Sequence, residues 1–96
     1  MKEIELQRTV EFMCRNMGFL YYHNPDSRRA VKGFPDLIIV GRSGVLYREL
    51  KDNAGWKTSE QTRWLYSLVA AGQNASVWQP SDLDSGRIEK ELQAIS

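Results

Sequence analysis

The sequence predicts a mixed α/β domain in which helices flank a central β-sheet. Two segments, residues 3–17 and 57–72, repeat apolar residues at the spacing of an α-helix. Two short apolar runs, residues 36–40 and 45–50, are joined by the tight connection GRSG, which is typical of a β-hairpin. Helical and strand patterns that follow one another in this way indicate the order α-β-β-β-α-β-α.

Residues 3–17 form the first predicted helix. Its apolar residues recur on one helical face: Leu6, Val10, Met13 and Met17. Gly18 follows at the position where helices commonly end in a left-handed glycine. We therefore expect this helix to pack that face against the sheet and to end at residue 17 or 18.

Three strands are expected next. The aromatic-rich run 19–23 is the first strand, and a polar loop over residues 24–34 leads to the hairpin. In the hairpin, residues 36–40 and 45–50 pair antiparallel, and the glycines of the GRSG connection are expected to supply positive φ angles.

The rest of the chain predicts a helix, a strand and a last helix. Thr58 and Gln61 have the spacing of a capping box at the start of the second helix, and Leu65 lies on its apolar face. Residues 75–79 form the last predicted strand. Residues 81–95 have the pattern of one short amphipathic helix.

Length and composition indicate one domain, residues 1–96, in a reducing compartment. With a net charge of +1, any nucleic-acid partner must be held by a local basic patch. The single cysteine, Cys14, cannot form an internal disulfide. The N-terminal segment lacks the pattern of a signal peptide, and no run approaches the roughly 20 apolar residues of a membrane span. We expect a cytoplasmic protein with no membrane partner and no small-molecule cofactor.

Charged residues stand at unusual positions in the two hairpin strands. Glu49 and Lys51 are two residues apart and so share one face of their strand. Antiparallel pairing brings Asp36, at the start of the first strand, beside them. Two carboxylates held this close repel each other unless a positive charge lies between them, and their hard oxygen atoms suit Mg²⁺ or Mn²⁺. The implied chemistry is hydrolysis of a phosphodiester, with Lys51 orienting the nucleophile or stabilising developing charge.

A simpler interpretation exists for the same residues. A strand that ends in Glu-x-Lys is commonly a solvated edge with a cross-strand ion pair, and Asp after Pro is a common turn residue. The position of both halves on adjacent predicted strands, in register, favours the catalytic interpretation. Both interpretations stay open from the residues alone.

The sequence resembles the VRR-NUC (virus-type replication-repair nuclease) family of the PD-(D/E)XK nucleases. The segments that match are KEIELQ, YYHNPDSRR, KGFPDLIIV, YRELK, SEQTRWLYSLVAAG and VWQPSDL, which span nearly the whole chain in order. The resemblance implies a restriction-endonuclease-like fold and a metal-dependent DNA endonuclease of the compact type found in bacteria and phages. Homodimers that act on branched DNA, such as Holliday junctions or flaps, are known in the family.

The resemblance also implies roles for individual residues. It makes Asp36 and Glu49 the metal-binding acids, the carbonyl of Leu50 a further metal ligand, and Lys51 the catalytic lysine. Mg²⁺ or Mn²⁺ is the implied cofactor.

The family also uses a glutamate from the first helix, where this chain offers Glu3 and Glu5. Glu3 lies nearer the apolar face and is favoured as a metal ligand, although an acid in the first turn of a helix is stabilising without any metal. Gln7, one turn later, is a plausible supporting residue. Gln61 matches the family's glutamine after the lysine motif, or else serves only the cap with Thr58.

Several other residues are candidates for substrate contact. Arg28, Arg29 and Lys32 lie in the loop before the hairpin, where cations could hold DNA phosphates. His23 is more simply a strand-end hydrogen-bonding residue than a general base. Trp56, Trp64 and Trp78 could stack on splayed bases, but the last two lie in regular elements and are better assigned to core or dimer contacts.

Three classes of function are compatible with the sequence. The leading class is a Mg²⁺-dependent, structure-selective DNA endonuclease that works as a homodimer in a bacterial cell or phage-infected host. An RNA substrate is a variant of it. The alternatives are a non-catalytic nucleic-acid-binding module that retains the fold, and a structural protein in which the charged residues coincide by chance.

Overall fold

The computed structural model describes residues 1–24 and 31–96. The sheet has the strand order β1-β2-β3-β4, in which the first three strands are antiparallel and β4 is parallel to β3. The element bounds are α1 Glu3–Met17, β1 Leu20–His23, β2 Leu37–Val40, β3 Val45–Leu50, α2 Ser59–Ala70, β4 Asn74–Trp78, α3 Pro80–Asp84 and α4 Arg87–Gln93. The predicted mixed sheet flanked by helices is therefore confirmed.

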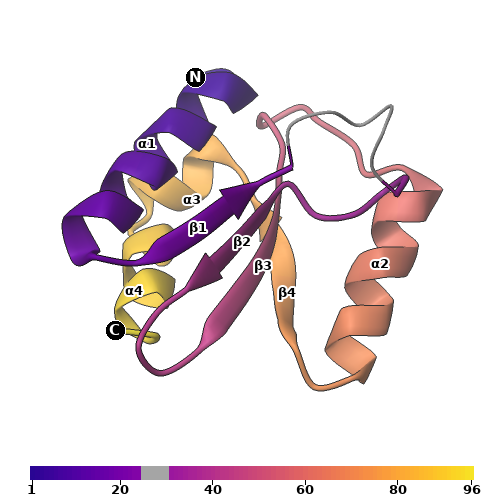
Figure 1. Ribbon diagram of the computed structural model, residues 1–96. Helices are drawn as coiled ribbons and strands as arrows, with labels where there is room; N and C mark the ends of the chain where they lie inside the picture. The colour runs from indigo at the N-terminus through magenta and orange to yellow at the C-terminus, as the bar shows by residue number, and fades with distance from the viewer. Residues whose placement is uncertain (25–30) are drawn as a thin grey trace.

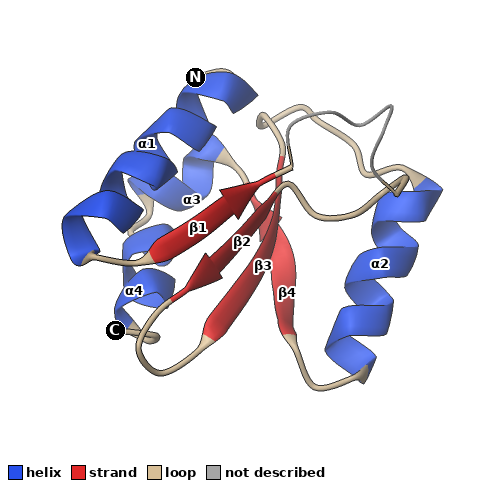
Figure 2. Ribbon diagram, in the orientation of Figure 1, coloured by secondary structure: helices blue, strands red, loops and turns tan. Residues whose placement is uncertain are grey.

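The helices cover the two faces of the sheet unequally. Helices α1, α3 and α4 lie on one side, and α2 lies alone on the other (Figures 1 and 2). The buried core fills the side with three helices, where the apolar faces of α1 and α4 meet alternate residues of the strands. Its members include Leu6, Val10, Cys14, Leu37, Ile39, Leu46, Leu50, Trp78, Ile88 and Leu92.

Helix ends follow the expected chemistry at two places. Gly18 ends α1 in the left-handed conformation, with φ of 74°. At the start of α2, the Thr58 hydroxyl accepts from the Gln61 backbone N–H, and the Gln61 side chain accepts from the Thr58 backbone N–H. Both ends were predicted from single residues and their spacing.

The predicted single helix over residues 81–95 is wrong. The segment forms two helices, α3 and α4, because Gly86 between them adopts a left-handed conformation with φ of 84°. No helix in the described parts of the chain is long and apolar enough to span a bilayer.

The expected role of the hairpin glycines is also wrong. Neither Gly41 nor Gly44 is among the glycines with positive φ. A Cβ atom at Gly44 would lie 2.9 Å from Cγ2 of Ile95, and one at Gly41 would lie 2.8 Å from Cγ1 of the same side chain. The Ser43 backbone N–H donates to the Ile95 carbonyl at 3.0 Å. Glycine is needed here because the C-terminal segment packs directly on the turn.

Candidate active site

The hairpin brings Asp36 and Glu49 to the same end of the sheet. In the β2–β3 ladder, Leu37 pairs with Arg48, so the register continued by one residue places Asp36 opposite Glu49. The Leu50 backbone N–H donates to Oδ2 of Asp36 at 2.8 Å, and the Asn24 backbone N–H donates to the Asp36 carbonyl at 2.9 Å. Asp36 is thereby held between β1 and β3.

Glu49 is almost completely buried, with only 2% of its surface exposed. Its Oε2 atom accepts from the side-chain amide of Gln61 at 2.7 Å and lies 3.4 Å from the Lys51 ammonium. Its Oε1 atom has no hydrogen-bond partner among the described residues. Buried carboxylate oxygens are nearly always paired, so this oxygen is open to a proton shared with Asp36, a water molecule or a cation.

The charge state of Glu49 reflects this crowding. Burial, followed by the negative charge of Asp36, raises the pKa of Glu49 from 4.5 to about 8, although Lys51 acts in the opposite direction. Two neighbouring carboxylates cannot both ionise comfortably without added positive charge. The pair therefore favours either a shared proton or a cation.

The charges of Asp36 and Lys51 also act on the Glu3 carboxylate. Burial raises the pKa of Glu3, and the charge of Asp36 adds to this effect while Lys51 opposes it. Glu5 instead folds back on the helix start, where its carboxylate accepts from the Lys2 backbone N–H at 3.0 Å. Of the two acids in the first turn, Glu3 is the one that the site acts on.

The oxygen atoms around Asp36 and Glu49 decide whether a divalent cation fits this site. No group of three or more His, Cys, Asp or Glu side chains in the described residues forms a ready-made metal site. Asp36 and the unpaired Oε1 of Glu49 supply hard oxygen donors at the same end of the hairpin. Because the Leu50 N–H points to Asp36, its carbonyl lies on the same edge of β3 and adds a third oxygen. This donor set suits Mg²⁺ or Mn²⁺.

Gln61 has two structural roles at once. Its side-chain oxygen completes the cap of α2, and its side-chain nitrogen donates to Glu49. The sequence left these roles as alternatives, whereas the structure contains both contacts. Gln7 instead donates to Glu11 at 3.2 Å, one turn further along α1, and among the described residues no hydrogen bond joins it to Glu3, Asp36 or Glu49.

Of the three loop cations, Lys32 belongs to the described residues. Arg28 and Arg29 lie outside the described residues. Lys32 is exposed and pairs with Glu60 at 3.4 Å, next to Gln61. Gly33, with φ of 87°, lies directly against Glu60. A Cβ atom at Gly33 would be 2.7 Å from the Cβ atom of Glu60, so glycine is needed for this close approach.

The remaining sequence candidates divide between core and surface. Trp78 and Cys14 are fully buried, as expected for core residues. Trp64 is half-buried, with its ring packed edge-on against Phe34 at 5.1 Å between centroids. His23 is half-buried at the end of β1.

Two features near the site were not foreseen. Asp52 directly follows Lys51, and its negative charge also raises the pKa of Glu3. Arg48 precedes Glu49 but points to the opposite face of β3, where it is 1% exposed. An arginine at an inward position of a strand was the available signal for the second feature.

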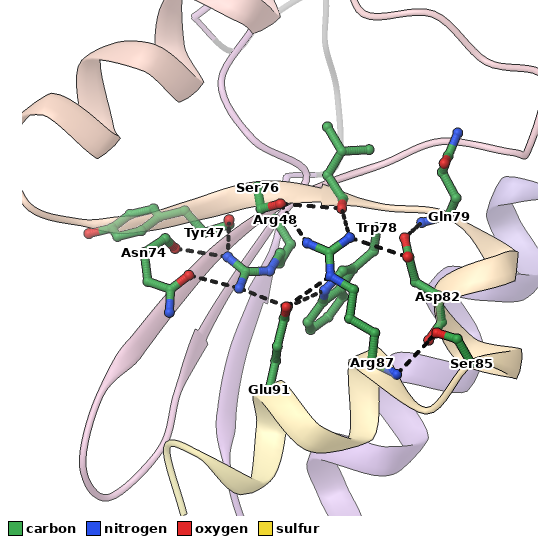
Figure 3. A network of polar contacts seen from close by, with 11 residues as sticks. Tyr47, Arg48, Asn74, Ser76, Trp78, Gln79, Asp82, Ser85, Arg87 and Glu91 are labelled. Carbon is green, nitrogen blue, oxygen red and sulfur yellow. Dashed lines mark hydrogen bonds and ion pairs between the residues drawn. The ribbon is translucent and has the colours of Figure 1, made fainter.

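Arg48 belongs to a buried polar network that holds α4 against the sheet (Figure 3). Its guanidinium donates to Glu91 at 3.0 Å and to the side chain of Asn74 at 2.8 Å, and lies 5.0 Å from the ring centre of Trp78. Arg87 donates to the other oxygen of Glu91 at 2.9 Å. The strand that holds Glu49 is therefore fixed by side-chain contacts on both faces.

The fold and the site together define a small α/β domain with two acids and a lysine at the open end of a hairpin. The chain is similar to a solved structure described as a "VRR_NUC domain protein", with a TM-score of 0.64 and 24% identity over 82% of this chain and 78% of the other. It is also similar to one described as a "VRR_NUC domain", with a TM-score of 0.71 and 21% identity over 88% of this chain and 91% of the other.

The two likenesses establish the fold. The restriction-endonuclease-like arrangement predicted from the sequence is therefore confirmed. No family model matches the sequence, and no curated protein matches it.

Proposed function

We propose that this protein is a VRR-NUC nuclease that hydrolyses phosphodiester bonds of DNA in a metal-dependent reaction. The observation that carries the proposal is the buried Glu49 carboxylate, with one oxygen unpaired among the described residues and with Asp36 and Lys51 beside it. A structural ion pair at a strand edge would be solvated and would leave no buried oxygen unpaired.

The residues present have separable roles in this proposal. Asp36, Glu49 and the Leu50 carbonyl would hold Mg²⁺ or Mn²⁺, with Glu3 as a further ligand from α1. A divalent cation bound there supplies positive charge that offsets the carboxylates and polarises the phosphodiester.

The other side chains prepare the reaction. Gln61 orients the Glu49 carboxylate through its hydrogen bond at 2.7 Å and keeps the unpaired oxygen directed away from α2. The Lys51 ammonium, 15% exposed, is placed to orient the attacking water or stabilise the charge that develops on the phosphate. Lys32, Arg28 and Arg29 are proposed to contact the backbone phosphates of the substrate.

A second copy of the chain is proposed as partner. Leu20 and Val40 pair across β1 and β2 on the face away from the core, and they are 74% and 40% exposed. Tyr22, on the same face, is 56% exposed. Such apolar exposure supports a homodimer with two sites that could cut branched DNA symmetrically in a bacterial cell or phage-infected host. A monomer mass by light scattering would count against it.

The test of activity is cleavage of a labelled panel: four-way junction, flap, linear duplex, single-stranded DNA and RNA. Each substrate is incubated in Mg²⁺, in Mn²⁺ and in EDTA. We expect metal-dependent cleavage by the wild type that is lost in Asp36→Asn and Lys51→Ala and kept in the control Lys90→Ala, an exposed lysine of α4.

The outcomes separate the classes of function. Cleavage unaffected by Asp36→Asn and Lys51→Ala would overturn the assignment of the site. Tight junction binding without cleavage would instead indicate a non-catalytic nucleic-acid-binding module.

A further inference from the structure

Trp56 is exposed to an extent that no folding role explains. It is 89% exposed, more than any other large apolar side chain in the described residues. A tryptophan with so little contact contributes almost nothing to the core. Its removal should therefore leave the fold intact.

The loop that displays Trp56 is attached to the rest of the protein on both sides. The Ser81 backbone N–H donates to the side chain of Asn53 at 3.1 Å, and the backbone N–H groups of Ala54 and Gly55 donate to Asp52 at 3.0 Å. The capped first turn of α2 follows the loop. The backbone that leads to Trp56 is thus held by the surrounding structure.

This position is next to the proposed catalytic lysine. A Cβ atom at Gly55 would lie 3.1 Å from Cβ of Lys51, so the loop folds back onto that residue immediately before Trp56. Lys57, the next residue, is also exposed. An exposed aromatic side chain and an exposed lysine therefore directly follow the loop residue that packs on the proposed catalytic lysine.

We propose that Trp56 stacks on an unpaired nucleobase next to the scissile phosphate and makes the enzyme prefer DNA with splayed bases at the cut. The inference rests on the function proposed above. In a continuous duplex, both faces of each base are already stacked on neighbours, so an exposed indole gains a partner only where a base is unpaired. Lys57 adds attraction to the adjoining phosphate without reading sequence.

The experiment measures binding to two substrates in the Glu49→Gln background, which holds DNA uncut. One is a fluorescein-labelled fork and the other a linear duplex, and fluorescence anisotropy gives Kd for each. Base stacking is worth about 5- to 150-fold in affinity. We expect Trp56→Ala to weaken fork binding in that range, to leave duplex binding unchanged, and Trp56→Phe to restore most of the affinity.

Two controls test the mechanism of any loss. Tyr66→Ala removes an aromatic side chain of α2 that is 73% exposed, and it should change neither Kd. A fork with an abasic analogue in place of the unpaired base should bind the Glu49→Gln protein equally well with and without Trp56→Ala, because the stacking partner is gone.

The result can refute the inference without refuting the nuclease. If the protein cleaves forks but Trp56→Ala binds fork and duplex as before, or weakens both equally, stacking on an unpaired base is wrong. A change in mass of Trp56→Ala by light scattering would assign the indole to a protein interface instead. If the wild type neither binds nor cleaves any DNA or RNA, the proposed function fails and the inference fails with it.

Discussion

Replacing Glu49 by glutamine should stabilise the metal-free protein while abolishing activity. The wild-type carboxylate is buried beside Asp36, and its pKa is raised from 4.5 to about 8. Glutamine keeps the acceptor for Gln61, and its amide can donate to the Asp36 carboxylate. The substitution therefore removes a carboxyl group that the metal-free fold must hold in its protonated form.

The change in wild-type stability with pH follows from the difference in proton binding between the folded and unfolded states. Between about pH 4.5 and pH 8, the unfolded chain releases the Glu49 proton while the folded protein keeps it. Wild-type stability therefore falls as pH rises through this window, whereas Glu49→Gln does not titrate at this position. At about 1.4 kcal/mol for each unit of pKa, the advantage of the variant reaches about 3 kcal/mol at neutral pH.

The assay is thermal unfolding in EDTA at several pH values. An advantage of that size corresponds to roughly 10 °C or more in Tm for a domain of this length. Glu89→Gln, an exposed acid of α4, serves as the matched control and should show no such trend. The reasoning is refuted if Glu49→Gln is less stable than wild type at neutral pH, or if its advantage does not grow as pH rises.

Three further outcomes are expected. Excess Mg²⁺ or Mn²⁺ should raise the Tm of the wild type but not that of Glu49→Gln; at a metal concentration of a hundred times Kd, the gain in the free energy of unfolding is about 2.7 kcal/mol. Calorimetry that shows no heat of metal binding to the wild type would contradict this expectation. Gln61→Ala should lower kcat, whereas Thr58→Ala should leave kcat unchanged and lower the free energy of unfolding, measured in urea, by about 1 kcal/mol. If both variants lose the same fraction of kcat, Gln61 acts only as a capping residue. Glu91→Ala should destabilise the fold by about 3 kcal/mol because Arg48 stays buried without its ion partner, and urea unfolding at wild-type stability would show that this pair is dispensable.

Local sequence signals predicted most of the elements. Helix α1, the hairpin strands and the cap of α2 depend on spacing and on residues such as Gly18 and Thr58, whose effects act within a few positions. The convergence of Asp36, Glu49 and Lys51 followed from strand alternation and hairpin pairing, which are also local. These are the features that short-range chemistry determines.

Long-range contacts could not be foreseen in the same way. The turn glycines are required by Ile95, more than fifty positions away, and the inward guanidinium of Arg48 donates to Glu91. The burial of Glu49, which raises its pKa, depends on how α2 packs beside β4. Nothing in the segment around each residue identifies these partners.

The split C-terminal segment shows a related limit. Residues 81–95 have a continuous amphipathic pattern, and Gly86 could have been tolerated within one helix at a modest cost. The structure instead uses its left-handed conformation to place Ile88 and Leu92 in the core and Glu91 beside Arg48. A pattern based on periodicity cannot distinguish a tolerated glycine from one that redirects the chain.

The contacts of Glu91 and Ile95 also affect when the hairpin can reach its final packing during synthesis. The hairpin is synthesised early, yet its turn packs on Ile95 and its buried Arg48 pairs with Glu91. A nascent chain that ends before these residues leaves an arginine without its acid and a glycine turn exposed to water. The strand pair that presents the two acids therefore reaches its final packing only when residue 95 has emerged from the ribosome.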